Sequence, residues 1–188
     1  KSLDPMTDPE LAPLTINEFQ ELTHVSDETL RNLEKYKDIL TQWQKKINLV
    51  SQKSLNDLWR RHMLDSAQLF SHLINVKNPI IDLGSGAGFP GLVLAIMGLK
   101  NIHLVESDNR KCTFLREISV QTNTDATIHN ARIEKMDTID AGVFRCLARL
   151  CSPFTGRKWI LSVSKGAKGG TGIDPLPEKS DDAGPADR

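Results

Sequence analysis

The stretch from Ile80 to Met97 constrains the fold more than any other part of the chain. It opens with Ile80-Ile81-Asp82-Leu83, places four glycines within the next eight residues, and becomes apolar again from Leu92 onward. This pattern predicts a buried strand, a sharp turn and a helix packed back on the strand. Glycines accept positive φ and let a ligand lie against the backbone, beside the free N–H groups of the helix that follows.

Two kinds of ligand commonly occupy such a turn, a dinucleotide and S-adenosylmethionine. Three of the glycines match G-x-G-x-x-G, which alone is weak support for a dinucleotide. Pro90 removes an N–H that a phosphate would use. Asp82 lies two residues before Gly84. A carboxylate at this position can order the turn that contains Gly84 and Gly86, and it can order polar groups near the amino-acid part of the ligand. These details favour S-adenosylmethionine, and an NAD-dependent oxidoreductase is the alternative.

The composition limits the function classes that remain. The 188 residues suit one α/β domain, and 24 basic residues balance 24 acidic ones, so any polyanion site must be a local patch. Cys112, Cys146 and Cys151 show no C-x-x-C spacing and no partner histidines, which predicts reduced thiols without a metal. The chain has no apolar run near the roughly 20 residues of a membrane span, so we expect a cytoplasmic protein with no membrane partner.

Apolar residues at helical spacing predict a helical segment over residues 14–77. The expected elements are a short helix around Ile16–Leu22, a long helix after the N-cap Ser26 that reaches Ile47, a loop at Asn48–Ser51, a helix ending near Arg60-Arg61-His62, and a further helix over Met63–Leu73. Between Arg31 and Asp65, eight basic residues exceed four acidic ones, which suggests a phosphate-contacting surface.

After the glycine turn, strands and helices alternate. We expect strands at Ile102–Glu106 and Ala126–His129, with an amphipathic helix over 109–122 between them. In open α/β sheets, an acid about twenty residues beyond the turn can accept both ribose hydroxyls, which is the role expected of Glu106. Loops at the carboxyl ends of strands build the ligand crevice, so Ile133 and Glu134 are candidates to flank an adenine.

Four motifs in this order resemble a known family. They are Asn48-Leu49-Val50-Ser51, Leu58-Trp59-Arg60-Arg61-His62-Met63-Leu64-Asp65-Ser66, Asp82-Leu83-Gly84-Ser85-Gly86-Ala87-Gly88-Phe89-Pro90-Gly91 and Leu104-Val105-Glu106-Ser107. Together they resemble the bacterial RsmG family (GidB, glucose-inhibited division protein B). The resemblance covers roughly Ile16 to Glu134 and implies a Rossmann-like class I methyltransferase fold, a doubly wound and mainly parallel α/β sheet preceded by helices.

The resemblance also implies an activity, a partner and a set of contacts. The family transfers a methyl group from S-adenosylmethionine to N7 of one guanosine in 16S ribosomal RNA of the small subunit. Carried over by position, it implies cofactor contacts at Gly84, Phe89, Glu106, Ile133 and Glu134. An arginine after the family's fourth strand also contacts the cofactor, and Arg145 is the nearest match, although the chain reads Phe144-Arg145-Cys146 where the family usually has Ser/Ala-Arg-Ala.

From about Ala141 onward the chain departs from the family. Trp159–Gly166 faintly echoes a family strand, and a tail rich in Pro, Asp and Gly follows, which predicts disorder over 171–188. We therefore expect a cloning remnant and disordered lead over 1–13, the helical segment over 14–77 and a cofactor-binding methyltransferase domain over 78–170.

Methylation of guanine N7 needs no general base, because N7 carries a lone pair and no proton. We therefore nominate no catalytic residue and expect proximity and orientation to dominate. Arg60, Arg61 and His62 are the candidates for contact with ribosomal RNA. The departure after Ala141 leaves open a second interpretation, a ribosomal RNA-binding protein that is catalytically impaired.

Overall fold

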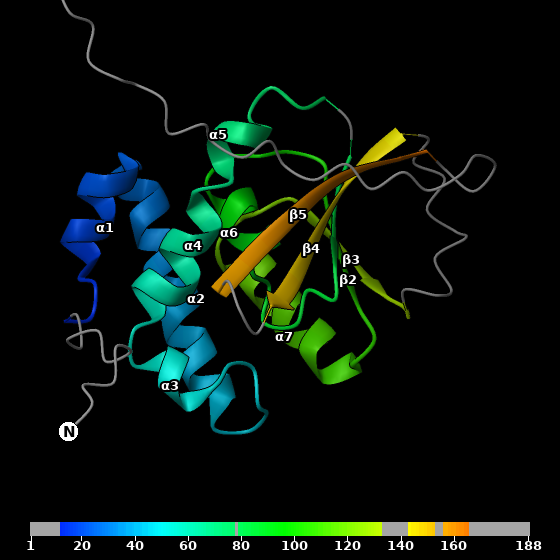
Figure 1. Ribbon diagram of the computed structural model, residues 1–188. Helices are drawn as coiled ribbons and strands as arrows, with labels where there is room; N and C mark the ends of the chain where they lie inside the picture. The colour runs from blue at the N-terminus through cyan, green and yellow to red at the C-terminus, as the bar shows by residue number, and fades with distance from the viewer. Residues whose placement is uncertain (1–11, 78, 133–142, 153–155, 166–188) are drawn as a thin grey trace, which may run out of the picture.

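The computed structural model describes residues 12–77 and 79–132, and the backbone of 143–152 and 156–165. Helices gather on one face of a five-stranded sheet, with the N-terminal helices stacked outside the helices that connect the strands (Figure 1). The helical elements are α1 (Ile16–Thr23), α2 (Asp27–Gln44), α3 (Gln52–Leu55), the π-helix η1 (Trp59–Leu64), α4 (Asp65–Ala67), α5 (Phe70–Leu73), α6 (Gly91–Ile96) and α7 (Asn109–Gln121). The strands are β1 (Ile80–Leu83), β2 (Ile102–Glu106), β3 (Ala126–Asn130), β4 (Val143–Ser152) and β5 (Gly156–Lys165).

Capping residues define where the first two helices begin. Thr15 and Glu18 form a capping box at α1, in which each side chain hydrogen-bonds to the backbone N–H of the other residue. Ser26 caps α2 by accepting from the N–H of Thr29 at 3.2 Å, as expected from the sequence. The face of α2 that carries Leu33, Tyr36 and Leu40 is fully buried. The amphipathic pattern thus packs α2 against the rest of the domain.

The helix end expected at Arg60-Arg61-His62 is wrong. These residues lie in the middle of η1, which runs directly into α4. The sequence contains no Gly or Pro here to end a helix, and Trp59, His62 and Met63 are all buried. The backbone therefore stays helical from η1 into α4, and the wider π-helical turn accommodates the three buried side chains.

The strand order is β3-β2-β1-β4-β5, which identifies the doubly wound type of sheet. β1 pairs in parallel with both β2 and β4, β2 pairs in parallel with β3, and only the β4–β5 pair among these strands is antiparallel. From β1 the chain moves outward to β2 and β3, and later returns to the other side of β1 at β4. The point between β1 and β4, where the order reverses, is where ligands bind in such sheets, outside the carboxyl ends of the strands.

The sequence-based prediction of a mainly parallel α/β sheet preceded by helices is therefore confirmed. The first two strands have the expected bounds, and the third extends one residue further than expected. One buried apolar cluster contains residues from both the helical segment and the sheet, so the two parts share a core. The expected lead and tail lie mostly outside the described residues, and the proposed domain boundaries stay a prediction.

Gly91 should be required by packing. A Cβ on Gly91 would lie 2.3 Å from Leu104 Cδ2 and 2.7 Å from Asp82 Oδ2. We expect Gly91→Ala to lower the free energy of unfolding by about 1–3 kcal/mol, because the overlap forces β2 and α6 apart. Urea unfolding measures this, with Ser71→Ala, an exposed change on α5, expected to stay within about 0.5 kcal/mol of the unaltered protein. Equal stability of the two variants would contradict the packing argument.

Candidate functional site: a cavity over the glycine turn

A cavity of about 360 Å³ opens where β1 ends. One wall is the glycine turn itself, and the opposite wall comes from the loop after α2, from α3 and from η1. Its lining includes Asp82, Leu83, Gly84, Ser85, Gly86, Ala87 and Phe89 on the first side, and Leu49, Val50, Ser51, Ser54 and His62 on the second. Its size falls within the range of small-molecule pockets, and its position at the sheet's reversal point is the one expected for a ligand.

The backbone of the glycine turn is anchored on the end of β2. The N–H groups of Gly84 and Ser85 both donate to the carbonyl oxygen of Val105, at 2.9 and 3.0 Å. Gly84 has a φ of +71°, and a Cβ built on it would meet nothing within 4 Å. No packing contact therefore requires a glycine here, and the positive φ is what favours one. The open space fits a ligand that lies directly on the main chain.

The side chain of Asp82 orders the glycine turn through a hydrogen bond, as expected from the sequence. Its Oδ2 accepts from the N–H of Gly91 at 3.0 Å, which ties the end of β1 to the start of α6. The residue is only 2 % exposed. Burial raises the pKa of Asp82 from 3.8 to about 7, against the opposing effect of the Gly91 N–H. A carboxyl with a pKa near neutrality can respond to a positively charged ligand in the cavity it lines.

Three aromatic rings form a column behind the turn. Phe89 stacks on Tyr36 of α2 at 5.2 Å between centroids and on His62 of η1 at 4.6 Å. The Tyr36 hydroxyl donates to the carbonyl oxygen of Ala87, and burial raises the pKa of that hydroxyl, with Asp82 adding to the effect. The column therefore joins two helices of the N-terminal segment to the turn.

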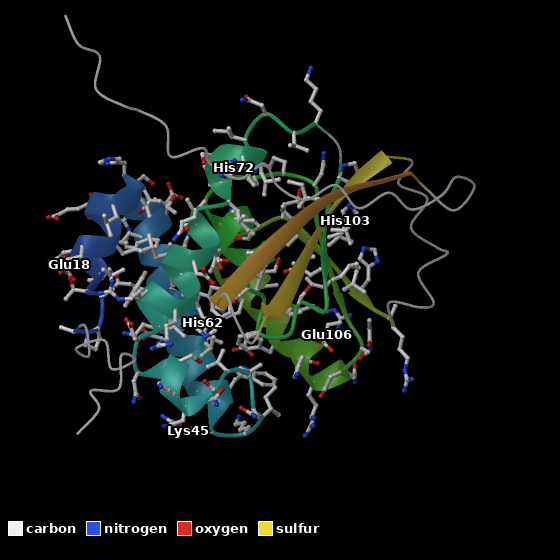
Figure 2. All side chains as sticks on the ribbon, in the orientation of Figure 1. Glu18, Lys45, His62, His72, His103 and Glu106 are labelled. Atoms are coloured by element: carbon white, nitrogen blue, oxygen red, sulfur yellow. The ribbon has the colours of Figure 1, made fainter. Side chains whose placement is uncertain are left out.

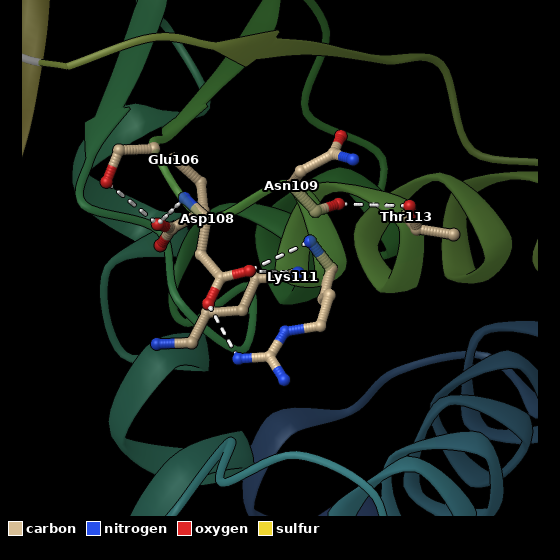
Figure 3. A network of polar contacts seen from close by, with 7 residues as sticks. Glu106, Asp108, Asn109, Lys111 and Thr113 are labelled. Atoms are coloured by element: carbon tan, nitrogen blue, oxygen red, sulfur yellow. Dashed lines mark hydrogen bonds and ion pairs between the residues drawn. The ribbon is translucent and has the colours of Figure 1, made fainter.

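Glu106 ends β2 beside the turn, and Figure 2 labels it at the sheet, opposite His62 in the helical layer. Its Oε2 accepts from the N–H of Gly86 at 2.9 Å and its Oε1 from the N–H of Asp108 at 2.8 Å. The neighbouring Asp108 caps α7 through the N–H of Arg110 (Figure 3). The Ser107 hydroxyl also donates to Oε1, at 3.5 Å, so Oε2 is the oxygen with a further acceptor site. The ribose contact expected from the sequence stays a prediction.

The three residues proposed to contact RNA do not form one exposed group. His62 is 5 % exposed and lines the cavity. Arg60 has its Nε 3.3 Å from Asp57 Oδ2, and its Nη2 donates to the carbonyl of Ala12 at 3.1 Å. Arg61 is half-buried on the same π-helix. The structure thus turns His62 inward, toward the ligand cavity, while Arg60 faces the N-terminal residues.

The remaining candidates lie apart from the cavity or beyond the described part of the chain. Ile133 and Glu134 lie outside the described residues. Arg145 lies within β4 rather than after it, and its Cα is paired with Ile80 at the amino end of β1. The glycine turn follows the opposite end of β1. Phe89, Asp82, Gly84 and Gly86 are therefore the candidates that the fold brings together at the cavity, with Glu106 behind them.

The second wall does not follow from the sequence. Asn48–Ser51 is one of the four family motifs, but its local pattern predicts only a loop, and no pattern singles out Ser54. Leu49, Val50, Ser51 and Ser54 come from a segment about thirty residues before the turn, and no spacing rule connects the two. The available signal is an abrupt loss of helical period in a short mixed polar and apolar stretch directly after a long helix.

Among the described residues, no group of three or more His, Cys, Asp or Glu side chains is arranged to hold a metal ion. Cys112 is a free, buried thiol whose Sγ donates to the carbonyl of Glu106 at 3.3 Å. Of the described helices, none combines the length and the apolar character needed to cross a membrane.

A strand, glycine turn and helix at the reversal point of a parallel sheet, with an acid ending the next strand, define a Rossmann-like domain, the class of fold in which nucleoside-containing cofactors bind at this point. A family model described as rRNA small subunit methyltransferase G (GidB) matches residues 29–165, well over half of the chain. The chain belongs to this family.

Curated relatives carry the same description. The proteins named Ribosomal RNA small subunit methyltransferase G from Paramagnetospirillum magneticum and Rhodospirillum rubrum are 54% and 50% identical over 128 and 131 residues. Each alignment covers 67% of this chain, but 62% and 65% of the relative, so the chain spans less than two thirds of their length. A solved structure described as a protein-L-isoaspartate O-methyltransferase from Plasmodium falciparum, in complex with S-adenosyl-L-homocysteine, has a TM-score of 0.47 with this chain. The two chains are 13% identical, and the match covers 86% of this chain and 92% of the other. This likeness is too distant to inform the site.

Asp82 should make stability depend on pH. Its pKa is higher in the folded protein, about 7, than its ordinary value of 3.8, so the folded state holds the proton more tightly. Stability is therefore lost as pH rises from about 4 to about 7, by up to about 4 kcal/mol. Asp82→Asn keeps an oxygen acceptor for the Gly91 N–H and has no charge to bury.

The measurement is urea unfolding of both proteins at several pH values between 5 and 8. The free energy of unfolding of Asp82→Asn should rise relative to that of the unaltered protein as pH increases through this range. Parallel pH curves for the two proteins would show that the Asp82 carboxyl titrates normally.

Proposed function

We propose that this chain binds S-adenosylmethionine over the glycine turn and transfers its methyl group to N7 of a guanosine in 16S ribosomal RNA of the small subunit. Membership of the family supports the reaction class. The observation that carries the site is the cavity at the carboxyl end of β1, where Gly84 has open space for a ligand and Asp82, Gly86 and Phe89 surround it.

The residues that line the cavity, together with Glu106 beside it, suit this cofactor. Gly84 leaves the main chain open to a flat or extended ligand, and Asp82 offers a carboxylate to a positively charged one. A cationic ligand favours the ionised form of Asp82, whose pKa of about 7 places that form within reach at neutral pH. The proposed ribose acceptor is Glu106, and its position beside the turn, with an acceptor site left on Oε2, supports this role.

The residues of this chain act mainly by orientation. S-adenosylmethionine, when bound, supplies an activated methyl group on a sulfonium. Guanine N7 has a free lone pair, so no side chain has to remove a proton. The chain contributes a buried turn held by the aromatic column of Tyr36, Phe89 and His62, and a second wall from which an acceptor base can approach. Holding the reacting atoms in line accounts for most of the expected rate gain.

Substitution of Gly84 tests the cofactor site. Gly84→Ala should weaken binding of S-adenosylmethionine in calorimetry by about tenfold or more, about 1.4 kcal/mol, because the new methyl group enters the cavity. The variant should still fold, at a cost of about 1–2 kcal/mol for a non-glycine residue at positive φ. Gly98→Ala is the matched control, since Gly98 also has a positive φ, of +110°, and open space around it but lies at the far end of α6.

Gly98→Ala should bind the cofactor as the unaltered protein does. The assignment fails if Gly84→Ala retains full affinity, or if NAD binds the chain and displaces S-adenosylmethionine, which is the result that an oxidoreductase would give.

Methyl transfer itself is tested with radiolabelled S-adenosylmethionine and small ribosomal subunits from a strain that lacks the modification. Label should appear in 16S RNA at one guanosine and be released by cleavage specific for 7-methylguanosine. Binding of both cofactor and subunit without incorporation of label would favour the catalytically impaired RNA-binding protein instead.

A further inference from the structure

One side chain holds the second wall of the cavity in place. Gln44 is the last residue of α2, and its Oε1 accepts from the N–H groups of both Leu49 and Val50 at 3.0 Å. Its Nε2 donates to the carbonyl oxygen of Val50 at 2.8 Å. The side-chain amide thus pairs with three main-chain groups of the loop, as a neighbouring strand would, and leaves them satisfied in a half-buried position.

This loop continues directly into the part of the wall that carries hydroxyl groups. Ser51 caps α3 by accepting from the N–H of Ser54 at 3.2 Å, and the Ser54 hydroxyl donates back to the carbonyl of Ser51 at 2.9 Å. Leu49, Val50, Ser51 and Ser54 all line the cavity, whereas Gln44 does not. Gln44 therefore sets the position of the wall from outside the site.

The two walls have one common support. Tyr36 of α2 donates to Ala87 in the glycine turn, and Gln44, eight residues later on the same helix, holds the facing loop. The separation between the walls is consequently set by α2. Because the glycine turn is also anchored on Val105 and Glu106, loss of the Gln44 contacts should move the loop and leave the turn in place.

We propose that Gln44 is a positioning residue that holds the Leu49–Ser51 wall where the acceptor base must stack or hydrogen-bond for methyl transfer. This inference rests on the proposed function and adds to it which wall receives the base. The glycine turn binds the donor, and the loop held by Gln44 presents the acceptor. A misplacement of about 1 Å between donor and acceptor can cost about 100-fold in rate, so a loop clamp affects catalysis without touching either reactant.

The test compares Gln44→Ala with Gln20→Ala. Gln20 makes a similar amide clamp at the joint between α1 and α2, where its Nε2 donates to Val25 O at 3.3 Å and to Asp27 Oδ1 at 2.8 Å. Both variants lose hydrogen bonds to a loop, but only Gln44 supports the cavity. Gln44→Ala should lower kcat/KM for small subunits by about 10- to 100-fold with little change in the dissociation constant of S-adenosylmethionine.

Gln20→Ala should leave both kinetic and binding constants unchanged. Gln44→Glu keeps the two acceptor contacts and loses the donors to Val50 O and to Asn48 Oδ1, so it should recover part of the lost kcat/KM. Hydrogen exchange provides a readout that does not depend on turnover: the amides of Leu49 and Val50 should be protected in the unaltered protein and in Gln20→Ala, and should exchange rapidly in Gln44→Ala.

Several outcomes would overturn the inference. They are full activity of Gln44→Ala, an equal loss in Gln20→Ala, or a loss of cofactor affinity as large as the loss of kcat/KM, which would assign the loop to the donor. If the unaltered chain binds the cofactor but transfers no methyl group, the proposed function and the acceptor role both fail. In that case hydrogen exchange at Leu49 and Val50 still tests whether Gln44 holds the loop. A failure of the proposed function is thereby distinguished from a failure of the Gln44 contacts.

Discussion

The hydrogen bond between the Asp82 carboxylate and the Gly91 N–H joins the strand and the helix on which the whole site is built. It closes a loop of backbone whose other anchor is the carbonyl of Val105, so the glycine turn is held from two sides. The close approach of Gly91 to Leu104 brings α6 onto β2 at the same point. The cavity lies over this doubly anchored turn, with Gly84 in its lining.

The turn also depends on elements that precede the sheet. Phe89 lies between Tyr36 and His62, which come from α2 and from the π-helix. The N-terminal helices therefore contribute directly to the site, in agreement with the single buried cluster that contains residues of both the helical segment and the sheet. Loosening α2 would disturb both walls of the cavity together.

Much of this arrangement could be predicted from the sequence. The strand bounds at Ile80–Leu83 and Ile102–Glu106, the N-cap at Ser26 and the turn-ordering role of Asp82 follow from local patterns, because apolar period, capping and glycine spacing act over a few residues. The inward position of His62 could not be predicted, since it depends on a π-turn and on a ring contributed by Phe89. The contribution of Val50 and Ser54 required knowledge of which distant segments meet.

Tyr36 is the one tyrosine of the chain, and its ring stacks on Phe89 while its hydroxyl is bonded to the carbonyl of Ala87. Any occupant of the cavity that shifts the turn must alter the surroundings of this ring. The protein thus carries a built-in magnetic-resonance reporter, because the ring-proton signals of its single tyrosine follow the site without an added label.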